Sequence, residues 1–171
     1  MIDDNIMDAF LAKEKQYLTT KYGPRFVKFI SSQVYAMWAA TQDENDFKSW
    51  PMFTTDAPLE AYRYVVIPIE KDAHWTAVIA NMKTKSLQEI CSMGYHSPTR
   101  IQHSIAILNA LTGKTSQWSM ARVTPKIQSN GLDCGPLLLV EILYVLMGKT
   151  FDFGENEGVA IRKWIARILL V

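Results

Sequence analysis

Two apolar segments separated by a short polar turn constrain the fold of this chain more than any other feature. Residues 62–69 read Tyr-Arg-Tyr-Val-Val-Ile-Pro-Ile, and residues 74–80 follow after the turn at 70–73. Segments rich in β-branched and aromatic residues are typical of strands. Residues 86–91 and 118–124 predict a third and a fourth strand, so the chain is expected to contain a central sheet.

Helices are predicted on both sides of these strands in the chain. Ser97-Pro98 combines a hydroxyl cap with a proline at the first helical position, which is typical of a helix start. Gly113 and Gly148 are typical of helix ends. The predicted helices cover 2–17, 26–38, 97–113, 134–147 and 160–170, and a polar loop is expected at 43–46. Three or four strands flanked by helices predict an α+β fold with a mixed or antiparallel sheet.

Composition restricts the class of protein. The 171 residues are 49% hydrophobic and 20% charged, which predicts one globular domain over residues 1–171. A formal net charge of +1 gives no indication of nucleic-acid binding, and no apolar run is long enough to span a membrane. With two cysteines and three histidines, we expect no disulfide framework, no metal site and no cofactor. A reducing intracellular compartment, nuclear or cytoplasmic, is therefore expected.

The segment from Gln128 to Gly135 carries the clearest chemical signal, reading Gln-Ser-Asn-Gly-Leu-Asp-Cys-Gly. Asp133 is a good N-cap, which makes Cys134 the first residue of a helix and places its thiol at the positive end of the helix dipole. A thiol there has a raised thiolate fraction. The N–H of Cys134 and the amide of Gln128 could point at a developing oxyanion, and Gly135 leaves room for a substrate backbone. A lone cysteine is more often structural, but these neighbours favour a nucleophile.

His74-Trp75, at the head of the second predicted strand, supplies the other half of the signal. A histidine at a strand edge can reach a thiolate from another element and serve as general acid and base. Taken alone, His74 and Trp75 are more typical of ordinary packing. Their interpretation therefore depends on the cysteine segment.

Together these segments resemble a known family, the SUMO-specific (sentrin-specific) cysteine proteases. The opening residues 2–11 look like that family's first motif, and residues 151–170 look like its C-terminal segment. The resemblance therefore covers nearly the whole chain. The motifs that carry it are, in chain order, Val65-Val66-Ile67-Pro68-Ile69, His74-Trp75-Thr76, Ser92-Met93-Gly94 and the segment 128–135.

The resemblance implies a papain-like cysteine protease fold in which histidine precedes cysteine. It implies Cys134 as nucleophile, His74 as base, Gln128 as oxyanion donor and Trp75 as a lid over a narrow tunnel that accepts a Gly-Gly tail. Gly135 and Asp133 are expected beside the substrate. The implied function is a cysteine peptidase or isopeptidase that cleaves after the Gly-Gly tail of SUMO or a related ubiquitin-like protein. SUMO, NEDD8 and ubiquitin share that tail, so the partner among them is left open.

Position 91 departs from the family pattern, because Cys91 stands where the family has an aspartate that orients the histidine. Removing that carboxylate from a serine-protease triad costs about four decades of rate, and a thiol is a weak hydrogen-bond partner. Three interpretations remain open. The site works as a dyad or with a substitute such as Glu89; the domain is a pseudoprotease that binds a partner protein; or oxidation reversibly joins Cys91 and Cys134 beside His74. The sequence favours an active enzyme.

Overall fold

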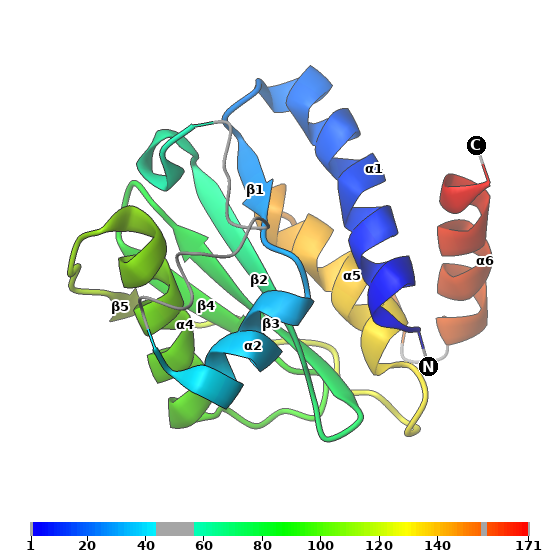
Figure 1. The fold of residues 1–171 in the computed structure, drawn as a ribbon. Coiled ribbons are helices and arrows are strands. Elements are labelled where there is room, and N and C mark those ends of the chain that lie inside the picture. The colour runs from blue at the N-terminus through cyan, green and yellow to red at the C-terminus, as the bar shows by residue number, and fades with distance from the viewer. Residues whose placement is uncertain (1, 44–56, 155–156, 171) are drawn as a thin grey trace.

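The structure, a computed structural model, describes residues 2–43, 57–154 and 157–170. Helices and strands both occur throughout these ranges (Figure 1). In chain order they are α1 (Asp4–Tyr22), β1 (Val27–Phe29), α2 (Gln33–Thr41), the 3-10 turn η2 (Leu59–Ala61), β2 (Tyr64–Lys71), β3 (His74–Asn81), β4 (Ser86–Ile90), α4 (Pro98–Thr112), β5 (Ser119–Met120), α5 (Cys134–Leu146) and α6 (Gly158–Leu169).

The strands of the described residues form one mixed sheet in the order β1-β2-β3-β4-β5. The central strands β2, β3 and β4 are antiparallel, whereas β1 and β5 run parallel to their neighbours. Asp72 and Ala73 join β2 to β3 with φ angles of 55° and 58°, which suit the twist of a tight hairpin. Lys71 therefore pairs with His74, the first residue of β3. The predicted α+β class with a mixed sheet is confirmed.

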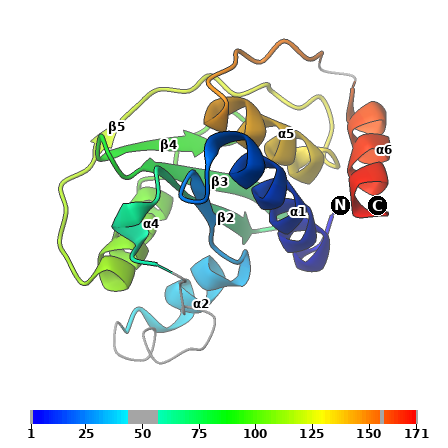
Figure 2. The same cartoon turned by 90° about the horizontal axis from the view of Figure 1, so that it is seen from above.

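Helices cover both faces of the sheet (Figure 2). Helices α2 and α4 cover the face lined by Val65 and Val78, and α1 and α5 cover the face lined by Val66. Helix α6 packs against α1 and α5 on the outside. Because side chains alternate along a strand, His74 lies on the α4 side of β3 and Trp75 on the α5 side. The end of β3 thus presents two neighbouring side chains to two different layers.

Two predicted elements are wrong in type or extent. Residues 26–38 are not one helix, because Val27–Phe29 pair with β2 and only the segment from Gln33 onward is helical. The strand predicted at 118–124 is limited to Ser119–Met120, beyond which the chain crosses toward α5 and the Lys126 N–H donates to Glu141. Both errors arise from contacts with distant parts of the chain. The loop predicted at 43–46 lies, apart from Asp43, outside the described residues.

Candidate active site

Cys134 is the first residue of α5, as predicted, and its side chain is buried. Asp133 precedes the helix, but the prediction that its carboxylate caps α5 is wrong: no side-chain capping bond is present. The carboxylate instead accepts from Asn130 Nδ2 at 2.7 Å and from Arg162 Nη2 of α6 at 2.8 Å. The Asn130 hydrogen bond, followed by Arg162, lowers the pKa of Asp133. Asp133 therefore anchors the loop before Cys134 to α6.

The imidazole ring of His74 contacts the thiol of Cys91. The His74 Nε2 atom lies 3.4 Å from the Cys91 sulfur, and both side chains are buried. The Tyr95 ring lies 6.1 Å from the His74 ring, centroid to centroid. Burial, and then the positive charge of Arg100, lower the pKa of the His74 imidazole. The site thus holds a histidine that favours its neutral form, with a thiol at the position of the family's aspartate.

Glu89 is not placed to substitute for that aspartate. Its buried carboxylate accepts from Arg100 Nε at 2.7 Å, from the Ser97 backbone N–H at 3.2 Å and from His96 Nδ1 at 3.0 Å. The interpretation that Glu89 orients His74 is therefore wrong, since both Glu89 oxygens accept from these three groups and neither accepts from His74 in the described structure. Sequence reasoning missed Arg100, although a cation in the first turn of a helix is unfavourable with the helix dipole and so signals an acidic partner.

Gln128 is fixed between the segment that follows β4 and the loop that precedes Cys134. Its backbone N–H donates to the Ser92 carbonyl at 2.9 Å, and its Oε1 accepts from the Ser92 hydroxyl at 2.6 Å. One N–H of its amide donates to the Asn130 carbonyl at 2.6 Å. Ser92 was not predicted as a site residue, yet it determines the orientation of the Gln128 amide.

Trp75 and Gly135 bring the histidine and cysteine segments together. A Cβ at Gly135 would lie 3.2 Å from Trp75 Cδ1 and would overlap the Ile2 side chain. Trp75 directly follows His74, and Gly135 directly follows Cys134. The contact between Trp75 and Gly135 therefore brings together the two chain segments that carry the predicted catalytic residues. In this structure, the space that Gly135 leaves is filled by Ile2 and Trp75. The Trp75 indole also donates to the Ile2 carbonyl at 2.9 Å.

We expect Trp75→Phe to lower the free energy of unfolding by about 1 kcal/mol, because it leaves the Ile2 carbonyl without its donor. Trp118→Phe is the control, since the buried Trp118 indole N–H has no hydrogen-bond partner among the described residues. Chemical denaturation of both variants measures the difference. An equal loss in the two variants would show that the Trp75–Ile2 bond contributes nothing to stability.

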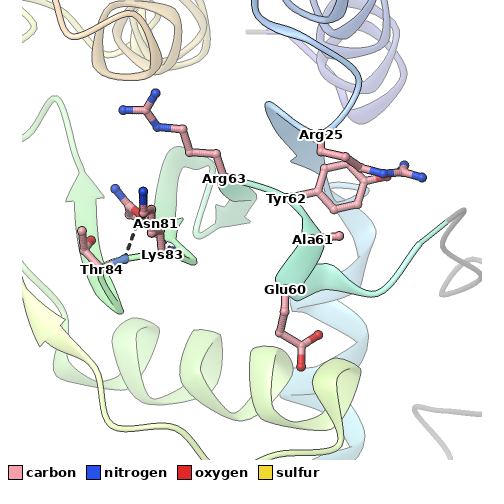
Figure 3. Close-up of a pocket in the computed structure, with 8 residues that line it drawn as sticks. All are labelled: Arg25, Glu60, Ala61, Tyr62, Arg63, Asn81, Lys83 and Thr84. Carbon is pink, nitrogen blue, oxygen red and sulfur yellow. Dashed lines mark hydrogen bonds between the residues drawn. The ribbon is translucent and has the colours of Figure 1, made fainter.

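A separate depression of about 530 Å³ lies at the opposite end of β3 (Figure 3). Asn81 lines it, seven residues from His74 and hence about 23 Å along the strand. Figure 3 shows the Arg25 guanidinium beside Tyr62, to whose hydroxyl it donates at 3.1 Å, and directed away from Asn81 and Lys83. The cations around this depression therefore do not converge, and it contains none of the predicted site residues.

Two further properties concern only the described residues. No helix within them is long and apolar enough to cross a membrane. Within the same ranges, no three His, Cys, Asp or Glu side chains gather closely enough to hold a metal ion. Both cysteines are free thiols, so the disulfide interpretation is not realised in this structure.

Comparison with known proteins gives one family and one fold. The family model for the C-terminal catalytic domain of the Ulp1 protease family matches residues 1–168. A SUMO protease Ulp1 with its catalytic cysteine oxidised to a sulfinic acid superposes with a TM-score of 0.82 at 18% identity, covering 99% of this chain and 77% of that one. The Ulp1 protease domain in complex with Smt3, the yeast ortholog of SUMO, gives 0.81 at 18% identity, with 99% and 76% covered.

A more distant structure shares the fold as well. The Xanthomonas campestris effector XopD bound to ubiquitin gives a TM-score of 0.68 at 20% identity, covering 97% of this chain and 90% of that one. A comparison with curated protein sequences found no match. At these identities, the structural likeness shows the fold, and the family model shows the family.

Proposed function

Because this chain belongs to the Ulp1 protease family, we propose that it is a cysteine peptidase or isopeptidase that cleaves after the Gly-Gly tail of SUMO or a related ubiquitin-like protein. The observation that carries the proposal is the meeting of the two chemical segments, in which Gly135 after Cys134 packs against Trp75 after His74. The complexes of Ulp1 with Smt3 and of XopD with ubiquitin support a ubiquitin-like partner.

In the proposed reaction, the Cys134 thiolate attacks the carbonyl carbon of the terminal glycine. His74 accepts the thiol proton and later donates it to the leaving amine, and water then releases the acyl-enzyme. The Cys134 N–H and the second N–H of the Gln128 amide stabilise the oxyanion. As the first residue of α5, Cys134 has a backbone N–H with no partner inside the helix, which supports this role.

We assign Cys91 the role of a weak orienting partner, so that Cys134 and His74 act as a dyad. A thiol at 3.4 Å can hold the ring but does not carry the full negative charge that stabilises an imidazolium. The lowered pKa of His74 supports this assignment. We place the activity in the nucleus or cytoplasm, where a buried pair of free thiols stays reduced.

A ubiquitin-like protein with a C-terminal electrophile tests this function. We expect the wild-type protein to form a covalent adduct with the SUMO, NEDD8 or ubiquitin version of the probe, seen as a mass shift. Cys134→Ala should abolish the adduct, and Cys91→Ala should retain it.

Two outcomes would contradict the proposal. Binding of a ubiquitin-like protein without any adduct would identify a pseudoprotease that serves as a binding module. An adduct that survives Cys134→Ala but is lost in Cys91→Ala would reassign the nucleophile to the thiol that contacts His74.

A further inference from the structure

Exposed apolar side chains concentrate around the candidate active site. Ten large hydrophobic residues are exposed in the described part of the chain, and four of them lie in two loops that carry site residues. Those loops are the segment after β4, which contains Ser92, and the segment before α5, which contains Gln128. The four residues are Met93 (52% exposed), Tyr95 (45%), Ile127 (50%) and Leu132 (62%). Such a concentration at one place is typical of an interaction surface.

Three of these residues, Met93, Tyr95 and Ile127, lie around Gly94. Gly94 separates Met93 from Tyr95 and has a φ of +77°. A Cβ at Gly94 would lie 2.9 Å from Ile127 Cδ1, so Ile127 packs directly on this glycine. The two hydrogen bonds between Ser92 and Gln128 hold the loops together at the adjacent positions. The apolar surface is therefore built on a fixed backbone.

Tyr95 links this surface to the reacting histidine. The Tyr95 ring lies 6.1 Å from the His74 ring, centroid to centroid. The guanidinium of Arg100 makes a cation–π contact with the Tyr95 ring, with its carbon 5.1 Å from the ring centroid. A general acid must touch the group to which it gives its proton. The leaving amine must therefore lie against His74, which places it close to Tyr95.

We propose that Met93, Tyr95 and Ile127 form a docking surface for the leaving-group side of the substrate, namely the stem of the acceptor lysine and the apolar residues that flank it in the target protein. This inference rests on the proposed function. A lysine in an isopeptide bond has lost its charge, so its four methylene groups are compatible with an apolar surface. The surface also adjoins the candidate site, because the ring of its member Tyr95 lies 6.1 Å from the His74 ring, centroid to centroid.

Two matched substrates test the inference. In each, the ubiquitin-like protein that reacts best with the electrophilic probe is joined by an isopeptide bond to the lysine of a short peptide. Leucines flank the lysine in one peptide, and serines flank it in the other. We expect the wild-type protein to prefer the leucine peptide by about tenfold in kcat/KM. The double variant Met93→Ser/Ile127→Ser should reduce that preference to about onefold. Because both peptides contain the lysine stem, cleavage of the serine peptide should also fall, but by less than cleavage of the leucine peptide.

Tyr17→Ser is the matched control, because Tyr17 is equally exposed (51%) on α1 and should leave the preference at about tenfold. Equal cleavage of the two peptides by the wild-type protein would overturn this inference alone. A preference that survives in the double variant, or self-association of the wild-type protein through this surface, would also overturn it. Failure to cleave either peptide would instead overturn the proposed function, and this inference with it.

Discussion

Replacing Cys91 with aspartate is expected to raise kcat by about a hundredfold. The new carboxylate would lie where the Cys91 sulfur now contacts His74 Nε2 at 3.4 Å. It would offset the effects of burial and of Arg100, both of which lower the pKa of His74, and would stabilise the imidazolium that forms as Cys134 reacts. A hundredfold is half, on a logarithmic scale, of the roughly four decades that an orienting aspartate contributes in serine proteases.

Cys91→Ser is the control for this substitution, because a hydroxyl is neutral and close in size to the thiol. We expect its kcat to stay within a few fold of the wild-type value. The NMR titration of the His74 ring should show a raised pKa only in Cys91→Asp. A folded Cys91→Asp protein with a raised His74 pKa and unchanged kcat would show that orientation of the histidine does not limit turnover.

Glu141 is expected to make the stability of the protein fall as the pH rises from about 4.5 to 7. Its carboxyl group is fully buried in α5, Oε1 accepts from the Lys126 N–H at 2.5 Å, and Oε2 has no partner among the described residues. Burial raises the pKa of Glu141 to about 7. The folded protein therefore holds this proton more tightly than the unfolded chain, whose glutamate has a pKa near 4.5.

The sign follows from the protons bound in each state. Below pH 4.5 both states are protonated, and stability is at its highest for this group. Between pH 4.5 and 7 only the unfolded chain releases the proton, so the free energy of unfolding falls by about 3 kcal/mol. Above pH 7 both states are ionised, and no further change is expected from Glu141.

Glu141→Gln removes this titration and keeps an oxygen for the Lys126 N–H. Unfolding by urea at pH 5 and pH 8 should show a drop in the wild-type protein that exceeds the drop in the variant by about 2.5 kcal/mol. Glu14, whose pKa is also raised by burial, is present in both proteins, so its contribution cancels in the difference. The same drop in both proteins would show that Glu141 does not titrate in this range.

The elements predicted correctly are those with signals inside their own segment. The hairpin of β2 and β3 follows from β-branched residues on both sides of a short turn. Helix α4 begins at a serine whose hydroxyl accepts from the Arg100 N–H and ends at Gly113 in the left-handed conformation. Helix α5 begins at Cys134 and α6 lies close to its predicted range. Periodicity and capping act within a few residues, so a single sequence contains them.

The features missed or mistaken depend on partners far along the chain. Strand β1 exists because Val27 pairs with Tyr64. The Asp133 carboxylate accepts from the nearby Asn130 and also from Arg162, which lies 29 residues later in the chain. The Glu89 carboxylate accepts a hydrogen bond from Arg100 of the next helix, α4. For each of these groups, several partners are compatible with the local sequence, and only the folded arrangement selects one.

The same division applies to the site. The order of His74, Gln128 and Cys134, and the cysteine at position 91, are properties of the sequence alone. Only the tertiary structure shows three contacts of the site. Cys91 contacts the His74 ring, Ser92 is hydrogen-bonded to Gln128, and Gly135 packs against Trp75. Residue types specify which chemistry is available, whereas hydrogen bonds and packing between distant segments decide which groups meet.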